Sequence, residues 1–132
     1  ETPFHPASHH GDREDRILDF AVINKFHVGL LPYFLEKLKN TEEGDTHLLD
    51  KTMIIYGSPM ADGNIHNHRR CPLIVLGGAS GGLEGNLHLK APDGTPMANV
   101  MLSLMHTLGH DDMDGFGDST GTFPLTMPMT DE

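Results

Sequence analysis

The sequence has few cysteines and few cationic residues, and each shortage excludes a class of protein. Its single cysteine, Cys71, cannot build an internal disulfide framework or a cysteine-rich zinc module. Nine Lys and Arg residues stand against nineteen Asp and Glu residues, which gives a formal net charge of -10. A charge of this sign repels phosphate backbones, so nucleic acid is not expected as a partner.

Long apolar runs are also missing. A membrane-spanning helix needs about 18 to 20 predominantly apolar residues, and from the sequence alone no segment is expected to reach that length. The first residues lack the charged-then-apolar order of a signal peptide, so any export signal is expected upstream of Glu1. A chain of 132 residues is long enough to bury a core, so no membrane span is needed to explain its apolar residues.

Histidine is the residue that the sequence has in excess. There are ten histidines, and four of them form two close pairs, His9 with His10 and His66 with His68. Paired histidines in loops are typical metal ligands, although solvated loop histidines are about equally common. The two pairs lie far apart in the sequence, so they share a site only if the fold brings them together.

The apolar pattern predicts one long helix and two buried strands. Residues 12–39 have helical apolar spacing, and Pro32 predicts a kink or a break within them. Short apolar runs at residues 52–56 and 72–76 are typical of strands covered on both faces. A helix from Thr95 to Leu108 is expected to lie on the sheet. Together these elements predict a three-layer α/β/α sheet.

The connection between the two predicted strands is rich in polar side chains. Asp62, His66 and His68 supply one carboxylate and two imidazoles, and two arginines follow directly. In open α/β sheets, ligand sites collect in the loops beyond the strand ends. Divalent metal ions take such mixed oxygen and nitrogen ligands. The alternative is a hydrated loop in which Asp62 only begins a turn.

These patterns predict a divalent metal site, with Zn, Mn or Ca as the candidate ions. The candidate ligands come from both histidine pairs and the loop carboxylate: His9, His10, Asp62, His66 and His68. The candidate contacts to an anionic substrate are Arg69 and Arg70. No catalytic nucleophile is expected in the chain, because Ser58, Ser80 and Thr95 lack an adjacent base.

Several motifs in order along the chain carry a resemblance to a known family. They include Ser8-His-His10, Tyr33-Phe-Leu-Glu-Lys-Leu38, Asp62-Gly-Asn-Ile-His-Asn-His68, Pro72-Leu-Ile-Val-Leu-Gly-Gly78 and Phe116-Gly-Asp-Ser-Thr-Gly121. The chain resembles the C-terminal part of a bacterial family of unknown function whose members usually carry a twin-arginine export signal. That family in turn distantly resembles the alkaline phosphatase, sulfatase and phosphoglycerate mutase superfamily.

The resemblance implies a fold, a location and an activity. It implies an alkaline-phosphatase-like α/β/α fold, of which residues 1–132 are either a single α/β domain or the C-terminal fragment of a larger one. It also implies a periplasmic or extracellular protein that hydrolyses a phosphate or sulfate ester with a metal ion. The superfamily's nucleophile belongs to its N-terminal half, so the isolated chain is expected to be inactive and to need the remainder of the parent chain.

The resemblance also places metal ligands at His9 or His10, between Ser58 and Asp62, and at His66 or His68. The chain departs from the superfamily pattern after the first predicted strand, where Ser58 stands in place of an acidic residue. The alternative function is a non-catalytic secreted domain that binds a partner or a glycan, or that serves in assembly.

Overall fold

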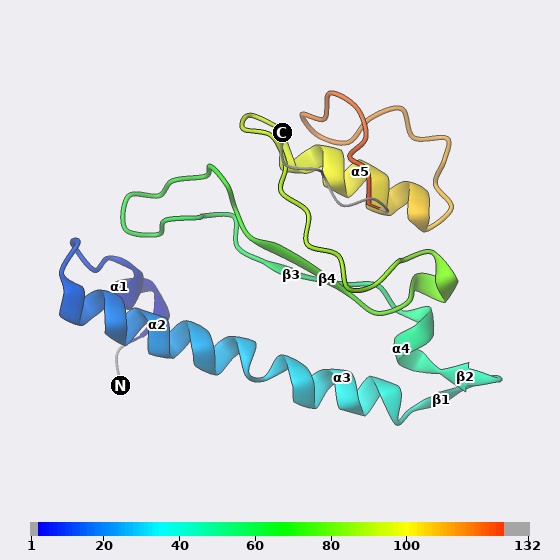
Figure 1. The fold of residues 1–132 in the computed structure, drawn as a ribbon, viewed down its shortest axis with the longest axis horizontal. Coiled ribbons are helices and arrows are strands. Elements are labelled where there is room, and N and C mark those ends of the chain that lie inside the picture. The colour runs from blue at the N-terminus through cyan, green and yellow to red at the C-terminus, as the bar shows by residue number, and fades with distance from the viewer. Residues whose placement is uncertain (1–2, 126–132) are drawn as a thin grey trace.

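The computed structural model describes residues 3–125 of the chain (Figure 1). The elements are α1 (Phe4–Ser8), α2 (Glu14–Val28), α3 (Leu31–Lys39), β1 (Glu42–Glu43), β2 (Thr46–His47), α4 (Leu48–Lys51), β3 (Ile54–Gly57), β4 (Leu73–Leu76), the 3-10 helix η1 (Ala79–Gly81) and α5 (Met97–Thr107). Helices α2 and α3 form a long arm on one side, and α5 lies on the other, with the β3–β4 ribbon between them.

The expected three-layer α/β/α sheet is wrong for the described residues. The two apolar runs do form strands, but β3 and β4 pair antiparallel with each other and with no further strand. The other sheet is the small β1–β2 hairpin. The chain reverses between β3 and β4 because residues Asp62 and Asn67 bridge and close a turn within the connection. The described part is therefore mostly helical, with two separate two-stranded hairpins.

The long helix breaks close to the predicted position. Helix α2 ends at Val28, and α3 begins at Leu31 with Pro32 in its first turn. Proline has no N–H to donate to the carbonyl of Val28, so the helical bonding cannot continue through this point. The N–H of Leu30 instead bonds to the carbonyl of His27, in a tighter turn.

The two helices together meet the length and composition of a membrane span. The stretch Glu14–Lys39 has 26 residues, and its most apolar window has a mean hydropathy of 1.2 and no buried residue. The expectation that no segment approaches this length is therefore wrong, because two abutting helices supply it jointly. Signal sequences and packed helices of soluble proteins have the same properties, so length and composition alone do not distinguish these cases.

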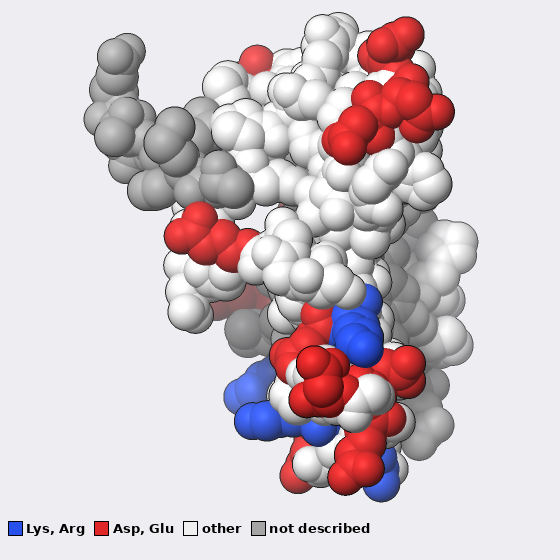
Figure 2. All heavy atoms as spheres, turned by 90° about the vertical axis from the view of Figure 1, so that its right-hand side faces the viewer, with Lys and Arg blue, Asp and Glu red and all other residues white. Residues whose placement is uncertain are grey.

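Acidic side chains cover the end of the molecule at which α3 meets the β1–β2 hairpin. Figure 2 shows carboxylates mixed with cationic side chains in the lower part of the view, where α3 and the hairpin lie, and a separate group of carboxylates at the top, on the side of the molecule that holds α5. Glu42, Glu43, Asp45 and Asp50 are all exposed here. The surface therefore carries the negative charge that the composition indicates.

The glycines after β4 allow a close approach between two backbones. A Cβ on Gly77, whose φ is +92°, would lie 2.1 Å from the carbonyl oxygen of Thr52. The N–H of Gly78 bonds to the carbonyl of Leu49 at 3.0 Å. This glycine-rich segment is a turn that packs η1 against α4.

The best-buried part of the described chain lies around α5. Leu102 and Leu104 are each 2% exposed, and Phe123 packs there from the following loop. The hydroxyl of Ser103 accepts a hydrogen bond from the N–H of Phe123 at 2.8 Å. The carboxamide of Asn99 exchanges two hydrogen bonds with Thr120. These contacts fix the chain after α5 against the helix.

Removing the Ser103 hydroxyl tests how much this contact stabilises the fold. In Ser103→Ala, the buried N–H of Phe123 loses its acceptor, so we expect the free energy of unfolding to fall by about 1–3 kcal/mol. Ser119→Ala is the matched control, because it removes an exposed bond to the N–H of Phe116. Urea denaturation of both variants measures the difference, and equal losses would show that burial at Ser103 is unimportant.

Candidate metal centre

Two of the site's histidines are fixed by the short helix α1. His5 lies in α1 and His9 follows its last residue, four positions further along the chain. Residues four apart on a helical turn face the same side, so the two rings are neighbours. Their Nε2 atoms lie 3.1 Å apart. The buried Ser8 hydroxyl donates to the carbonyl of His5 at 2.8 Å and closes the turn between the two rings.

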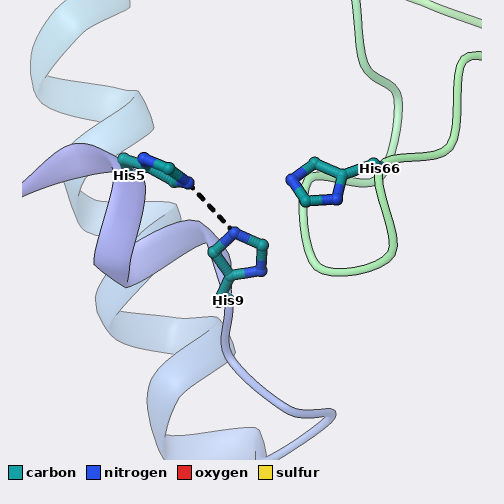
Figure 3. Close-up of side chains that lie close together, drawn as sticks. All are labelled: His5, His9 and His66. Carbon is teal, nitrogen blue, oxygen red and sulfur yellow. Dashed lines mark hydrogen bonds between the residues drawn. The ribbon is translucent and has the colours of Figure 1, made fainter.

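The third histidine comes from the connection between β3 and β4. The N–H of Ala61 bonds to the carbonyl of Asn67, and the N–H of Asn67 bonds back to the carbonyl of Asp62, each at 2.9 Å. Within this turn, His66 has a φ of 55°, a left-handed conformation. The conformation directs its ring toward α1, where it meets the His9 ring edge-on with centroids 4.9 Å apart (Figure 3).

The three rings form a group that can hold a metal ion. One nitrogen from each of His5, His9 and His66 lies within 4.8 Å of the others. Two imidazole nitrogens on one tetrahedral zinc ion, each bound at about 2.0–2.1 Å, are separated by about 3.4 Å. The spacing between His5 and His9 is already close to this value. The exposed His66 ring needs only a small movement to complete the set.

The hydrogen bonds around His9 leave one of its nitrogens available. The Nδ1 atom of His9 lies 3.3 Å from the backbone carbonyl of Asn64, an acceptor, so Nδ1 carries the proton. The Nε2 atom then keeps its lone pair, which accepts from His5 in the metal-free state. A ligating histidine whose other N–H donates to a carbonyl is the usual arrangement in metal sites.

The structure brings together two of the five predicted metal ligands. His9 and His66 converge, as a shared site requires. His10 Nδ1 instead accepts the N–H of Asp12 at 3.1 Å, and Asp62 accepts the N–H of Asn64 at 2.9 Å. His68 Nδ1 lies 2.7 Å from the carbonyl of Pro59. These last three residues lie outside the group.

The two arginines expected to contact an anion differ in their surroundings. Arg70 makes two hydrogen bonds to the carboxylate of Asp93, at 2.7 and 3.0 Å. These bonds, and the positive charge of Arg70, hold the pKa of Asp93 below its ordinary value. The guanidinium of Arg70 is therefore already paired with Asp93. The backbone N–H of Arg69 bonds to the Asn67 side chain, and its own side chain remains exposed.

The ligand that sequence reasoning missed is His5. The signal was present as the spacing of His5 and His9 in a histidine-x-x-x-histidine pattern, which places both on one face if the segment is helical. The first eleven residues have no apolar periodicity, so the sequence gives no sign of a helix there. Helix α1 has five residues, too few for periodicity to identify it.

Comparisons of this chain with protein-family models, with curated proteins and with solved structures find no match. The resemblance drawn from the sequence motifs is therefore an expectation without support from these comparisons. The close grouping of the three histidines does not depend on this resemblance.

Zinc titration tests the metal centre. We expect one Zn²⁺ per chain, with affinity falling as the pH is lowered, because protons compete for the imidazoles. Loss of a ligand should weaken Zn²⁺ binding by more than the ~10–100-fold that is typical of residues that only orient the ligands. We expect this larger loss in each of His5→Ala, His9→Ala and His66→Ala. The exposed His88 provides the control variant His88→Ala. The ligand set would be contradicted if calorimetry showed that His10→Ala and His68→Ala weaken Zn²⁺ binding and that His5→Ala does not.

Proposed function

We propose that this chain binds one divalent metal ion through His5, His9 and His66, and that the ion serves a hydrolytic site in an exported bacterial protein. The convergence of three imidazole nitrogens from segments far apart in the sequence supports the proposal. Structural zinc sites have four protein ligands, whereas catalytic sites commonly have three and one open position. A three-histidine group on the surface fits the catalytic type.

The chain's own residues hold the ion and leave one face of it accessible. His5 and His66 are exposed and His9 is half-buried, so water or a substrate oxygen can reach the centre. A bound divalent ion supplies a Lewis acid and, with zinc, a water molecule whose pKa is lowered to about 7. The carbonyl of Asn64 supports this chemistry by keeping the His9 proton on Nδ1.

The proposed substrate is a phosphate or sulfate ester, in line with the family resemblance. A chain of net charge -10 repels such an anion, so a cation is needed where the anion binds. The metal ion supplies two positive charges at one point. Arg69 is the remaining candidate for a substrate contact, because Arg70 is engaged with Asp93.

The proposal divides the catalytic groups between this chain and another part of the parent protein. Ser58 uses its hydroxyl to accept the N–H of Met60, and among residues 3–125 no histidine or carboxylate bonds to it. A serine without an adjacent base is a weak nucleophile. The nucleophile is therefore proposed to lie in the remainder of the parent chain, as the superfamily resemblance implies.

Hydrolysis assays test this division. The isolated chain, loaded with Zn²⁺, Mn²⁺ or Ca²⁺, is expected to turn over neither an aryl phosphate nor an aryl sulfate above the metal-only rate. The longer parent protein is expected to hydrolyse one of them and to lose activity in His66→Ala but not in His88→Ala. Turnover by the isolated chain that disappears in His66→Ala would show that the division is wrong.

A second candidate function is a non-catalytic assembly domain, and one surface feature favours it. The arm carries an apolar stripe on its exposed side, formed by Leu18, Val22, Phe26, Leu30 and Tyr33. Each of these side chains is at least 53% exposed, and no residue of α2 or α3 is buried. A continuous apolar surface of this kind marks an interaction site.

The proposed occupant of this surface is another polypeptide, the remainder of the parent chain. The β3–β4 ribbon is apolar on both faces, with Ile55 and Ile74 exposed, and its outer edges pair with no other described strand. Hydrocarbon cannot satisfy unpaired backbone groups, whereas a polypeptide can. A second copy would bring the same net charge of -10, which opposes association.

Footprinting of aromatic side chains tests the docking surface. Phe26 and Tyr33 should be oxidised readily by hydroxyl radicals in the isolated chain and protected in the longer parent protein. The exposed Phe116 lies outside the stripe and serves as the internal control. Equal oxidation in both proteins would contradict the proposal, as would binding of the isolated chain to phosphatidylglycerol vesicles or its dimerisation in light scattering.

A further inference from the structure

The side chain of Asn64 joins the two segments that carry the histidines. Its Oδ1 accepts the N–H of Gly11 at 2.8 Å, and its Nδ2 donates to Oδ1 of Asp12 at 3.4 Å. Its backbone carbonyl lies 3.3 Å from Nδ1 of His9. One loop residue therefore contacts three positions of the turn that follows α1. We call this set of contacts the Asn64 clasp.

The turn that follows α1 depends on such an external partner. Gly11 and Asp12 have φ values of 60° and 57°, in the left-handed region that most residues avoid. The N–H of Gly11 accordingly bonds to the Asn64 side chain, and the N–H of Asp12 bonds to His10 Nδ1. His9 therefore stands between the last turn of α1, which it shares with His5, and this turn, which contacts Asn64.

Asn64 is itself held in place by its own loop. The carboxylate of Asp62 accepts the N–H of Asn64 at 2.9 Å. Next to it, Gly63 allows the loop to approach α1, because a Cβ there would lie 3.0 Å from the Cβ of the buried Ser8. The loop therefore presents a fixed amide to the turn, and the sequence Asp62-Gly63-Asn64 has a role beyond that of a surface turn.

We propose that Asn64 is a positioning residue of the metal centre, which sets the spacing between His9 and His66 without binding the ion. The inference rests on the proposed metal-binding function. Its physical basis is that His66 follows Asn64 closely on the same loop. The clasp therefore fixes the position of the loop that carries His66 relative to the turn that carries His9. Residues that orient metal ligands typically contribute about 10–100-fold to metal affinity.

A residue exchange tests the clasp while the net charge is kept constant. Asn64→Ala should lower Zn²⁺ affinity about ten-fold. Asn64→Asp adds a negative charge, which by itself attracts a cation. It should nevertheless lower the Zn²⁺ affinity, because the new carboxylate faces the carboxylate of Asp12 and is repelled by it. The double variant Asn64→Asp, Asp12→Asn restores the hydrogen bond between the two side chains with donor and acceptor exchanged, and it keeps an acceptor for the N–H of Gly11, so its affinity should return to within about three-fold of the original.

Two further measurements separate positioning from general stability. The visible absorption of bound Co²⁺ reports coordination geometry, so it should change in Asn64→Ala and recover in the double variant. The urea midpoint of the metal-free chain should be the same in all of them. As a second route, Gly63→Ala should weaken Zn²⁺ binding, whereas Gly85→Ala, where a Cβ meets nothing within 4 Å, should not.

The outcomes distinguish this inference from the proposed function. If the unmodified chain binds no Zn²⁺, the metal-binding function is wrong and the inference falls with it. If the chain binds Zn²⁺ and Asn64→Ala binds it equally well, only the positioning role is wrong. A double variant that remains as weak as Asn64→Asp would likewise overturn it, because the exchanged hydrogen bonds would then have no effect on the ligands.

Discussion

The contact between the turn after α1 and the loop after β3 is the constraint on which the candidate site depends. Nothing regular joins these two segments, since α1 packs mainly on α2 and the loop belongs to the ribbon. Asn64 and the close approach at Gly63 hold them together. Without this contact, His5 and His9 would still be neighbours on one helical turn, but His66 would be a solvated loop residue. The candidate metal centre therefore depends on the tertiary contact between these two segments.

The small core explains why so much apolar surface remains available for a partner. The buried apolar side chains of the described residues are Ala7, Ala79, Leu102, Leu104 and Phe123. They cluster mostly near α5, whereas the arm buries none of its own. Burying a large apolar side chain contributes about 1.5–3 kcal/mol, so covering the stripe offers a strong driving force for docking. The arm is thus better suited to an interface than to the exterior of an isolated domain.

Local patterns in the sequence predicted the elements better than their arrangement. The break near Pro32, both four-residue strands and α5 follow from spacing and backbone chemistry, which act over a few residues. The arrangement of the elements in layers does not follow from the sequence. A short apolar run looks the same in the sequence whether other elements cover both of its faces or leave them exposed. Similarly, the sequence predicts that the two histidine pairs share a site, but it does not tell that His9 and His66 meet while His10 and His68 lie outside the group. The direction of the His66 ring depends on a left-handed φ, which is uncommon for residues other than glycine and is not marked in the sequence.

Metal binding and partner docking are expected to be coupled in this architecture. The arm begins at the turn that carries His9, and the opposite end of the arm joins the rest of the chain through α4. An ion bound across His9 and His66 would tie the turn that precedes the arm to the loop, and a partner on the arm would hold the arm in place as well. Each event therefore removes part of the entropic cost of the other, and the coupling must be equal in both directions. A site assembled from two segments that share few contacts is then expected to bind a metal ion more tightly when the arm is covered than in the isolated chain.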